Sequence, residues 1–214
     1  MERVYINPGH SNIDPGAVKY ETERDLNVRT ALFMNSYLVK HYEVETKVTD
    51  GNLDRLKDIC SDANNWGADL FVSIHNNAGG GDGFECYVYN EKRRPLGQVF
   101  EKYVKALGQN SRGVKIQPGF VVLRDTNMPA VLLEGAFVDN LKDIQDWNDD
   151  EELKALGEAY AKAAAEYLGL KEKPVEPEKP EKIWRVQVGA YRDIKNAEAT
   201  KAKLKAAGFD AIIV

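Results

Sequence analysis

Short apolar runs of strand length alternate with longer helical patterns through most of this 214-residue chain. The patterns predict strands over residues 4–7, 44–48, 70–74, 84–89, 121–123 and 130–134, and helices over residues 23–40, 53–66, 93–107, 141–147 and 151–168. Strands separated by helices are typical of a sheet that is covered on both faces. The expected fold class is therefore α/β, a three-layer α/β/α arrangement around a mixed, mostly parallel sheet.

A segment rich in proline, glutamate and lysine, residues 171–182, divides the chain into a domain of residues 1–170 and a tail of residues 183–214. Its prolines recur every third residue, a composition that favours an extended linker and cannot build a core. In the tail, strand patterns over residues 184–191 and 211–214 flank a helical pattern over residues 196–207, with Asn196 near its N-cap. The tail is thus predicted to be one small βαβ unit, which is short for an independent core.

Charge and hydropathy argue against two classes of partner. The net charge is −5, and residues 1–170 carry 19 Lys and Arg against 27 Asp and Glu. Such an acidic domain repels phosphates, so we expect no nucleic-acid partner. No apolar run approaches the ~18 residues of a membrane span, so we expect no membrane partner either.

The first residues, 1–6, lack the basic and long apolar regions of a secretory signal, so we expect the chain to be cytoplasmic at synthesis. Cys60 and Cys86 lack CxxC spacing and are interpreted as free thiols, which fits a reducing compartment.

Two of the three histidines lie at the ends of strand-like runs. His10 ends the stretch Ile6-Asn7-Pro8-Gly9-His10, and His75 follows the run of residues 71–74. Side chains at the carboxyl ends of strands converge on the crevice where open α/β sheets bind ligands, so two imidazoles there suggest a metal. His41 ends a predicted helix, where a cation suits the helix dipole, and is interpreted as structural.

Two acidic residues could complete such a site. Glu23 opens the first long helix, where an acid is favourable in its own right, and Glu21 is an equally good candidate on chemistry alone. Glu134 lies inside the apolar run of residues 130–137, where a carboxylate is costly to bury unless it is paired or binds a metal. A catalytic zinc commonly uses three protein ligands and leaves a position for water, while a separate carboxylate moves the proton. The chain supplies these residue types without an HExxH or zinc-finger motif.

Three stretches carry a resemblance to a known family: residues 7–27 with Asn7-Pro8-Gly9-His10, Asp14-Pro15-Gly16-Ala17 and Glu23-Arg24-Asp25-Leu26-Asn27; residues 73–78; and residues 129–140. In this order they resemble the zinc-dependent N-acetylmuramoyl-L-alanine amidases of the amidase-3 type, over about residues 1–170. The resemblance implies that His10, Glu23 and His75 bind Zn²⁺ and that Glu134 is catalytic. It favours Glu23 over Glu21, because Glu23 precedes the Arg-Asp-Leu-Asn run. The implied reaction cleaves the amide between N-acetylmuramic acid and L-alanine in peptidoglycan.

The tail resembles the first half of a SPOR domain, a peptidoglycan-binding module. The resemblance rests on residues 184–191, on Asn196-Ala197-Glu198 and on Gly208-Phe209. Because half a module leaves strand edges open, we expect two chains to pair through residues 183–214 as a homodimer.

Two other functions stay open at this point: a different zinc hydrolase such as a carboxypeptidase, and a non-catalytic wall-binding protein. For a wall hydrolase without a signal, we expect action on the cell wall after release by lysis or through a holin. That setting fits a phage lysin or a mother-cell autolysin of a sporulating bacterium.

Overall fold

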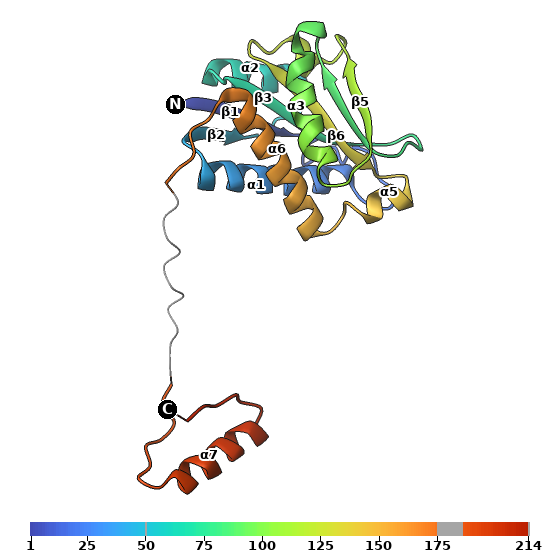
Figure 1. Ribbon diagram of the computed structural model, residues 1–214. Helices are drawn as coiled ribbons and strands as arrows, with labels where there is room; N and C mark the ends of the chain where they lie inside the picture. Colours follow the sequence, from blue (N-terminus) through green and yellow to red (C-terminus); the bar gives the residue numbers. More distant parts are fainter. Residues whose placement is uncertain (50, 175–185, 214) are drawn as a thin grey trace. The chain divides into compact units, whose positions relative to one another are not determined.

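The computed structural model describes residues 1–49, 51–174 and 186–213. The chain divides into two compact units, Met1–Val175 and Glu176–Val214, which are described separately. The first unit contains a six-stranded sheet, and the second contains helix α7 (Figure 1).

The sheet has the strand order β2-β1-β3-β6-β4-β5. Its strands are β1 (Glu2–Pro8), β2 (Val44–Val48), β3 (Leu70–Asn77), β4 (Phe84–Val88), β5 (Ser111–Ile116) and β6 (Ala130–Phe137). Strands β2, β1, β3 and β6 are parallel to one another. Strand β4 runs antiparallel to β6 and parallel to β5. The prediction of a mixed, mostly parallel sheet is confirmed.

Helices cover both faces of this sheet, which confirms the three-layer arrangement. One face packs against α1 (Glu23–His41), α3 (Arg94–Lys105) and α6 (Asp150–Leu168), and the other against α2 (Leu56–Trp66) and α4 (Val121–Arg124). Two short helices, η1 (Glu91–Arg93) and α5 (Leu141–Gln145), lie in the connections.

Alternating side chains of the central strands feed two separate cores. In β3, Leu70 and Val72 join the core under α1, α3 and α6, whereas Phe71 joins the core under α2 and α4. Strands buried on both faces carry nearly continuous apolar runs, which is why β1, β3 and β6 were recognisable from sequence. A residue that follows Phe71 by two or four positions therefore points to the α2 side of the sheet.

Two elements of this unit differ from the prediction. Residues 121–123 form the short helix α4 and not a strand, and Val122 and Leu123 are buried against α2. So short an apolar run carries no period that separates helix from strand. Strand β5 was not predicted, because its sequence, Ser-Arg-Gly-Val-Lys-Ile, mixes charges and glycine as an edge strand can.

The first residues of the predicted linker run beside the turn between α1 and β2. The backbone oxygen of Lys171 accepts a hydrogen bond of 2.9 Å from the amide of Glu43, and the amide of Lys173 donates one of 2.8 Å to His41. Residues 175–182 of the linker lie outside the described residues. No helix among the described residues is long and apolar enough to cross a membrane.

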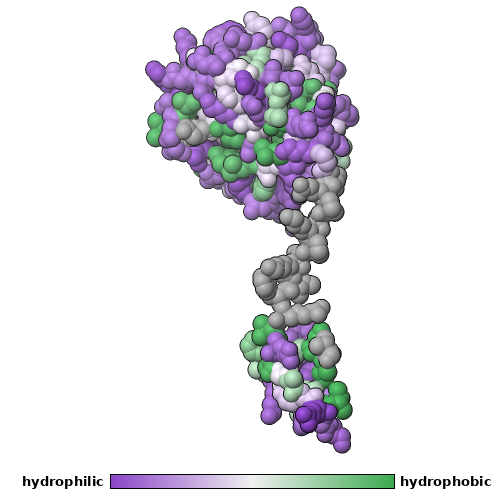
Figure 2. Space-filling view, turned by 90° about the vertical axis from the view of Figure 1, so that its left-hand side faces the viewer, coloured by the Kyte–Doolittle hydropathy of each residue, from purple (hydrophilic) through white to green (hydrophobic). Residues whose placement is uncertain are grey.

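In the second unit, α7 (Ile194–Ala206) begins after Asp193, whose side chain accepts a hydrogen bond from the amide of Lys195. The predicted cap near Asn196 is therefore three residues late. The strands predicted on either side of the helix are not formed by residues 186–191 and 209–213. No described residue of α7 is buried. Val186, Phe209 and Ile212 are among the exposed apolar residues of this unit, which appear in green in its surface (Figure 2).

Candidate functional site

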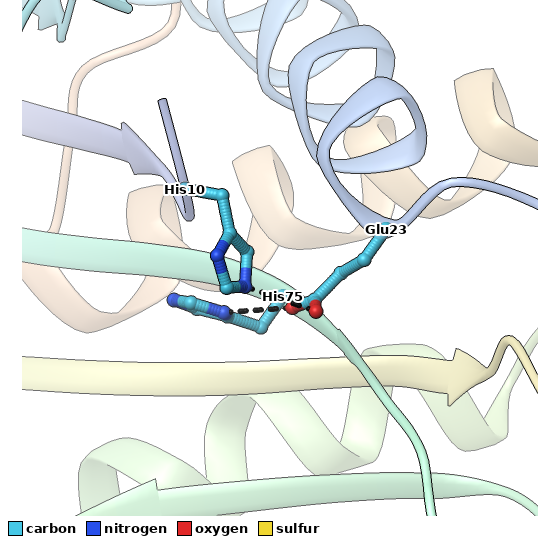
Figure 3. Close-up of side chains that lie close together, drawn as sticks. All are labelled: His10, Glu23 and His75. Carbon is cyan, nitrogen blue, oxygen red and sulfur yellow. Dashed lines mark hydrogen bonds and ion pairs between the residues drawn. The ribbon is translucent and has the colours of Figure 1, made fainter. Parts of the chain in front are cut away.

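Three side chains from different elements meet at the carboxyl edge of the parallel strands (Figure 3). His10 follows β1, His75 lies near the end of β3, and Glu23 is the first residue of α1. Beyond β1, the amide of Gly9 donates a hydrogen bond of 2.8 Å to Ile74, so the chain stays beside β3 as far as the turn. His10 then adopts a positive φ of 72°, and its ring centroid lies 5.3 Å from that of His75.

The Glu23 carboxylate lies between the two imidazoles. Its Oε2 is 2.9 Å from Nε2 of His10, and its Oε1 is 3.0 Å from Nδ1 of His75. The side chain is also held by the amides of Ala17 and Asn76, at 3.0 and 3.3 Å. With only 6% of its surface exposed, Glu23 has a fixed orientation toward both rings.

Two glycines leave the space that these side chains occupy. A Cβ on Gly9 would lie 2.1 Å from Cε1 of His75, and one on Gly16 would lie 2.6 Å from both Glu23 and His10. Both distances are far below van der Waals contact. Glycine is thus required at positions 9 and 16 by the packing of the site, and at position 16 also by a φ of +68°.

The contacts shift the pKa values of two of these groups. The hydrogen bond with Glu23 raises the pKa of His10 to about 9, although burial opposes this. Burial acts to raise the pKa of Glu23, but the hydrogen bonds with His10 and His75 outweigh it and lower that pKa. His10 and Glu23 therefore face each other as an ion pair, and His75 hydrogen-bonds to the same carboxylate.

The same three residues could hold a metal ion. One ligand atom from each lies within 4.8 Å of the other two. Two imidazole nitrogens and one carboxylate oxygen form a donor set that zinc uses in catalytic sites. A cation between them would replace the protons that now join the imidazoles to the carboxylate. Asp14 lies 2.9 Å from Nδ1 of His10, and an Nδ1–H donated to it leaves the lone pair of Nε2 facing the cluster.

Glu21, the alternative to Glu23, and His41, interpreted as structural, both lie outside this cluster. Glu21 accepts a weak hydrogen bond of 3.4 Å from Asn148. His41 packs against Tyr37 at the far end of α1, with ring centroids 4.2 Å apart. In the part of the chain that the structure describes, neither Glu21 nor His41 belongs to the group of His10, Glu23 and His75.

Glu134 lies on β6 directly beside His75 in the strand register. Its Oε2 is buried and has no hydrogen-bond partner in the described part of the chain. Burial raises the pKa of Glu134 to about 7, with Glu23 and Glu85 adding to the effect and His75 opposing it. A buried, unpartnered carboxylate that titrates near neutrality is typical of a general acid or base.

Glu85 is a further acidic residue of this edge that sequence reasoning did not single out. It lies on β4 opposite Glu134 and is only 2% exposed. The signal that identified Glu134, a carboxylate inside an apolar strand, is also present in the Phe84-Glu85-Cys86 sequence of β4.

Comparisons with known proteins agree along the whole chain. Residues 4–166 match the N-acetylmuramoyl-L-alanine amidase family, and residues 157–214 match the SPOR domain family. A sporulation-specific N-acetylmuramoyl-L-alanine amidase of Bacillus subtilis is 32% identical over 222 residues, covering 100% of this chain and 85% of that protein. An endolysin of Bacillus phage SPP1 is 36% identical over 183 residues, covering 79% of this chain and 67% of that protein.

A solved structure has the same fold. The catalytic domain of CwlV, an N-acetylmuramoyl-L-alanine amidase from Bacillus (Paenibacillus) polymyxa var. colistinus, superposes with a TM-score of 0.75 at 32% identity. The match covers 80% of this chain and 100% of that structure.

Proposed function

The chain belongs to the N-acetylmuramoyl-L-alanine amidase family, and we propose that it hydrolyses the amide between N-acetylmuramic acid and L-alanine in peptidoglycan at the edge formed by His10, Glu23, His75 and Glu134. The observation that carries this proposal is the pairing of a metal-ligand cluster with a buried, unpartnered carboxylate on the next strand.

In this proposal His10, Glu23 and His75 hold Zn²⁺. Zinc bound in this way lowers the pKa of a water to about 7 and polarises the carbonyl under attack. The buried position of Glu23 and its support from the amides of Ala17 and Asn76 keep its carboxylate aimed at both imidazoles. Asp14, which lies 2.9 Å from Nδ1 of His10, fixes the orientation of that ring.

Glu134 moves the protons. Its unpartnered Oε2 accepts a proton from the attacking water and returns it to the leaving nitrogen of L-alanine. In the metal-free protein, burial raises the pKa of Glu134 to about 7, so this carboxyl group can both accept and give up a proton near neutral pH.

Digestion of purified muropeptide in the presence of Zn²⁺ tests the reaction. An amidase produces free lactyl-muramic acid and a new amino terminus on L-alanine. Release of C-terminal amino acids would identify a carboxypeptidase, and walls that bind the protein without being cleaved would identify a non-catalytic binder.

Two variants test the assigned roles. Glu134→Gln should keep its zinc and lose about 10²–10⁴-fold in cleavage rate, because the water loses its base and the nitrogen its acid. His75→Ala should lose zinc by elemental analysis. Loss of zinc from a folded Glu134→Gln variant would make Glu134 a ligand and remove the role given to Glu23.

We further propose that residues 171–182 link a catalytic domain, residues 1–170, to a wall-binding module of residues 183–214. The match to the SPOR family supports the binding role, and the exposed apolar residues beside α7 support pairing of two modules in a homodimer. Light scattering on the intact chain at micromolar concentration tests the pairing, and a monomer would contradict it.

The relatives include a sporulation-specific amidase and a phage endolysin. On that basis we propose that this protein acts on the cell wall after release by lysis or through a holin. Wall digestion by a culture supernatant before and after lysis of producing cells distinguishes this route from ordinary secretion.

A further inference from the structure

A row of polar side chains that includes the proposed catalytic residue crosses the sheet. His75, Glu134 and Glu85 are register partners on the neighbouring strands β3, β6 and β4. Side chains of register partners lie on the same face, about 4.5–5.5 Å apart at Cβ. The row thus leads from the metal-ligand cluster toward the edge strand β5.

A bulge in β5 extends this row by one more residue. Between the pairs Phe84–Ser111 and Cys86–Val114, β4 has only Glu85, whereas β5 has Arg112 and Gly113. Gly113 has a φ of +88°, a left-handed conformation that glycine adopts without the steric cost of a side chain. The extra residue brings the side chain of Arg112 to Glu85.

Glu85 acts as a buried anchor for two cations. Its Oε1 accepts hydrogen bonds of 2.5 Å from Nε of Arg112 and from Nζ of Lys115. Its Oε2 accepts hydrogen bonds from the hydroxyl of Tyr87 at 2.5 Å and from Nδ2 of the Asn77 side chain at 3.2 Å. These hydrogen bonds account for both carboxylate oxygens, so Glu85 has no vacant oxygen for a ligand.

The two cations, by contrast, keep donors that face solvent. The side chains of Arg112 and Lys115 are 45% and 38% exposed. The Arg112 guanidinium also lies over the ring of Phe137, 5.5 Å from its centroid, and in the described residues it uses only Nε for hydrogen bonding. A planar group fixed by one nitrogen and one ring face presents its two terminal nitrogens in the fork that carboxylates fit.

Charge balance points to an anionic ligand. Two cations share the carboxylate of Glu85, so Glu85 alone neutralises only one of the two positive charges. In the intact substrate the lactyl carboxyl of muramic acid is consumed in the scissile amide. The negative charge of the substrate therefore lies in its peptide stem.

We propose that Arg112 and Lys115 form a subsite that binds a carboxylate of the peptide stem, on the leaving-group side of the scissile amide. This inference rests on the proposed amidase function. Strand β5 is two strand spacings from β6, about 10 Å. A stem peptide spans about 3.3–3.6 Å per residue, so a carboxylate on its second or third residue reaches the subsite while the amide lies at Glu134.

The test compares two muramoyl tripeptides, one with its stem carboxylates free and one with them converted to carboxamides. The zinc-loaded protein should cleave the free acid with a kcat/KM about 10- to 100-fold higher, mainly through a lower KM. One hydrogen bond to a charged group contributes a factor of this size. Arg112→Gln should remove most of this preference, and Lys115→Gln should reduce it in part. Each single variant leaves Glu85 one cation, which favours retention of the fold.

Arg124→Gln is the matched control, because Arg124 is equally exposed, at 44%, but pairs with Asp125, the residue that follows α4. Its preference for the free acid should match that of the unaltered protein. Binding of both tripeptides to the Glu134→Gln variant, measured by calorimetry, does not depend on turnover. Equal binding of the two tripeptides, or an unchanged preference in Arg112→Gln, would overturn the subsite. Failure to cleave either tripeptide while the binding preference holds would instead overturn the amidase function.

Discussion

At the scale of single residues, the site needs glycine where a Cβ atom would occupy the space of a ligand side chain. A methyl group on Gly9 would overlap the imidazole of His75 at 2.1 Å, so Gly9→Ala should displace that ring while the sheet stays folded. We expect a large loss of bound zinc, read by elemental analysis, with a small change in melting temperature. Gly119→Ala is the control, since its nearest neighbour would lie 3.3 Å away on a flexible glutamine. Full zinc occupancy in Gly9→Ala would show that His75 is not held where the structure has it.

Glu134 gives a second test at this scale, which needs no substrate. In the metal-free protein its pKa is about 7, against 4.5 for the ordinary group, so the folded state binds the proton more tightly than the unfolded state. The stability associated with that proton is complete below pH 4.5 and is lost as pH rises through 7. Glu134→Gln should therefore become more stable than the unaltered protein over this window, by up to about 3 kcal/mol. Denaturant titrations at several pH values measure the difference, and a difference that is constant with pH would contradict the burial of the charge.

At the scale of elements, the contact between α1 and α6 depends on Gly157. A Cβ there would lie 2.7–2.8 Å from Phe33, from the amide of Met34 and from the carbonyl of Thr30, all on α1. Helix propensity alone predicts that Gly157→Ala stabilises α6 by about 1 kcal/mol. We expect the opposite sign, a loss of about 1–3 kcal/mol, because the two helices must separate. Ala155→Gly on the same helix should show the ordinary propensity cost, and a more stable Gly157→Ala would mean that the helices adjust without cost.

Sequence patterns predicted the buried strands and the edge strand β2 well, but they did not predict the other edge strand, β5. Strands β1, β3 and β6 carry apolar runs because both of their faces are covered, and the histidines and Glu134 were noticeable as polar residues next to or inside those runs. Strand β5 has one partner and a bulge, so its sequence keeps no regular alternation. Because β5 was not predicted, its residues Arg112 and Lys115 were not identified as candidates either. Glu85 carried the same signal as Glu134, but only the register shows that the two face each other.

At the scale of the whole molecule, the two units should have separate functions, cleavage in the first and wall binding in the second. The first unit has its own two cores and the complete ligand cluster, so residues 1–174 should cleave soluble muropeptide at close to the rate of the full chain. The same fragment should pellet with purified cell walls less than the full chain does, because it lacks the region matching the SPOR family beyond residue 174. A sedimentation assay with inactive Glu134→Gln versions of both proteins measures binding without digestion. Equal sedimentation would move the wall-binding role to the first unit.

The strand order also has a consequence for how the protein is made. Strand β6 is the last strand of the sheet to be synthesised, yet it lies between β3 and β4 in its middle. Until residue 137 has left the ribosome, β3 and β4 have no partner on that side, and open edges of this kind invite pairing with other chains. Insertion of β6 joins the two halves of the sheet and brings Glu134 between His75 and Glu85 in the same event. A nascent chain thus has no hydrolytic centre until β6 has joined the sheet. A chain that terminates before β6 is prone to aggregate and cannot cleave peptidoglycan.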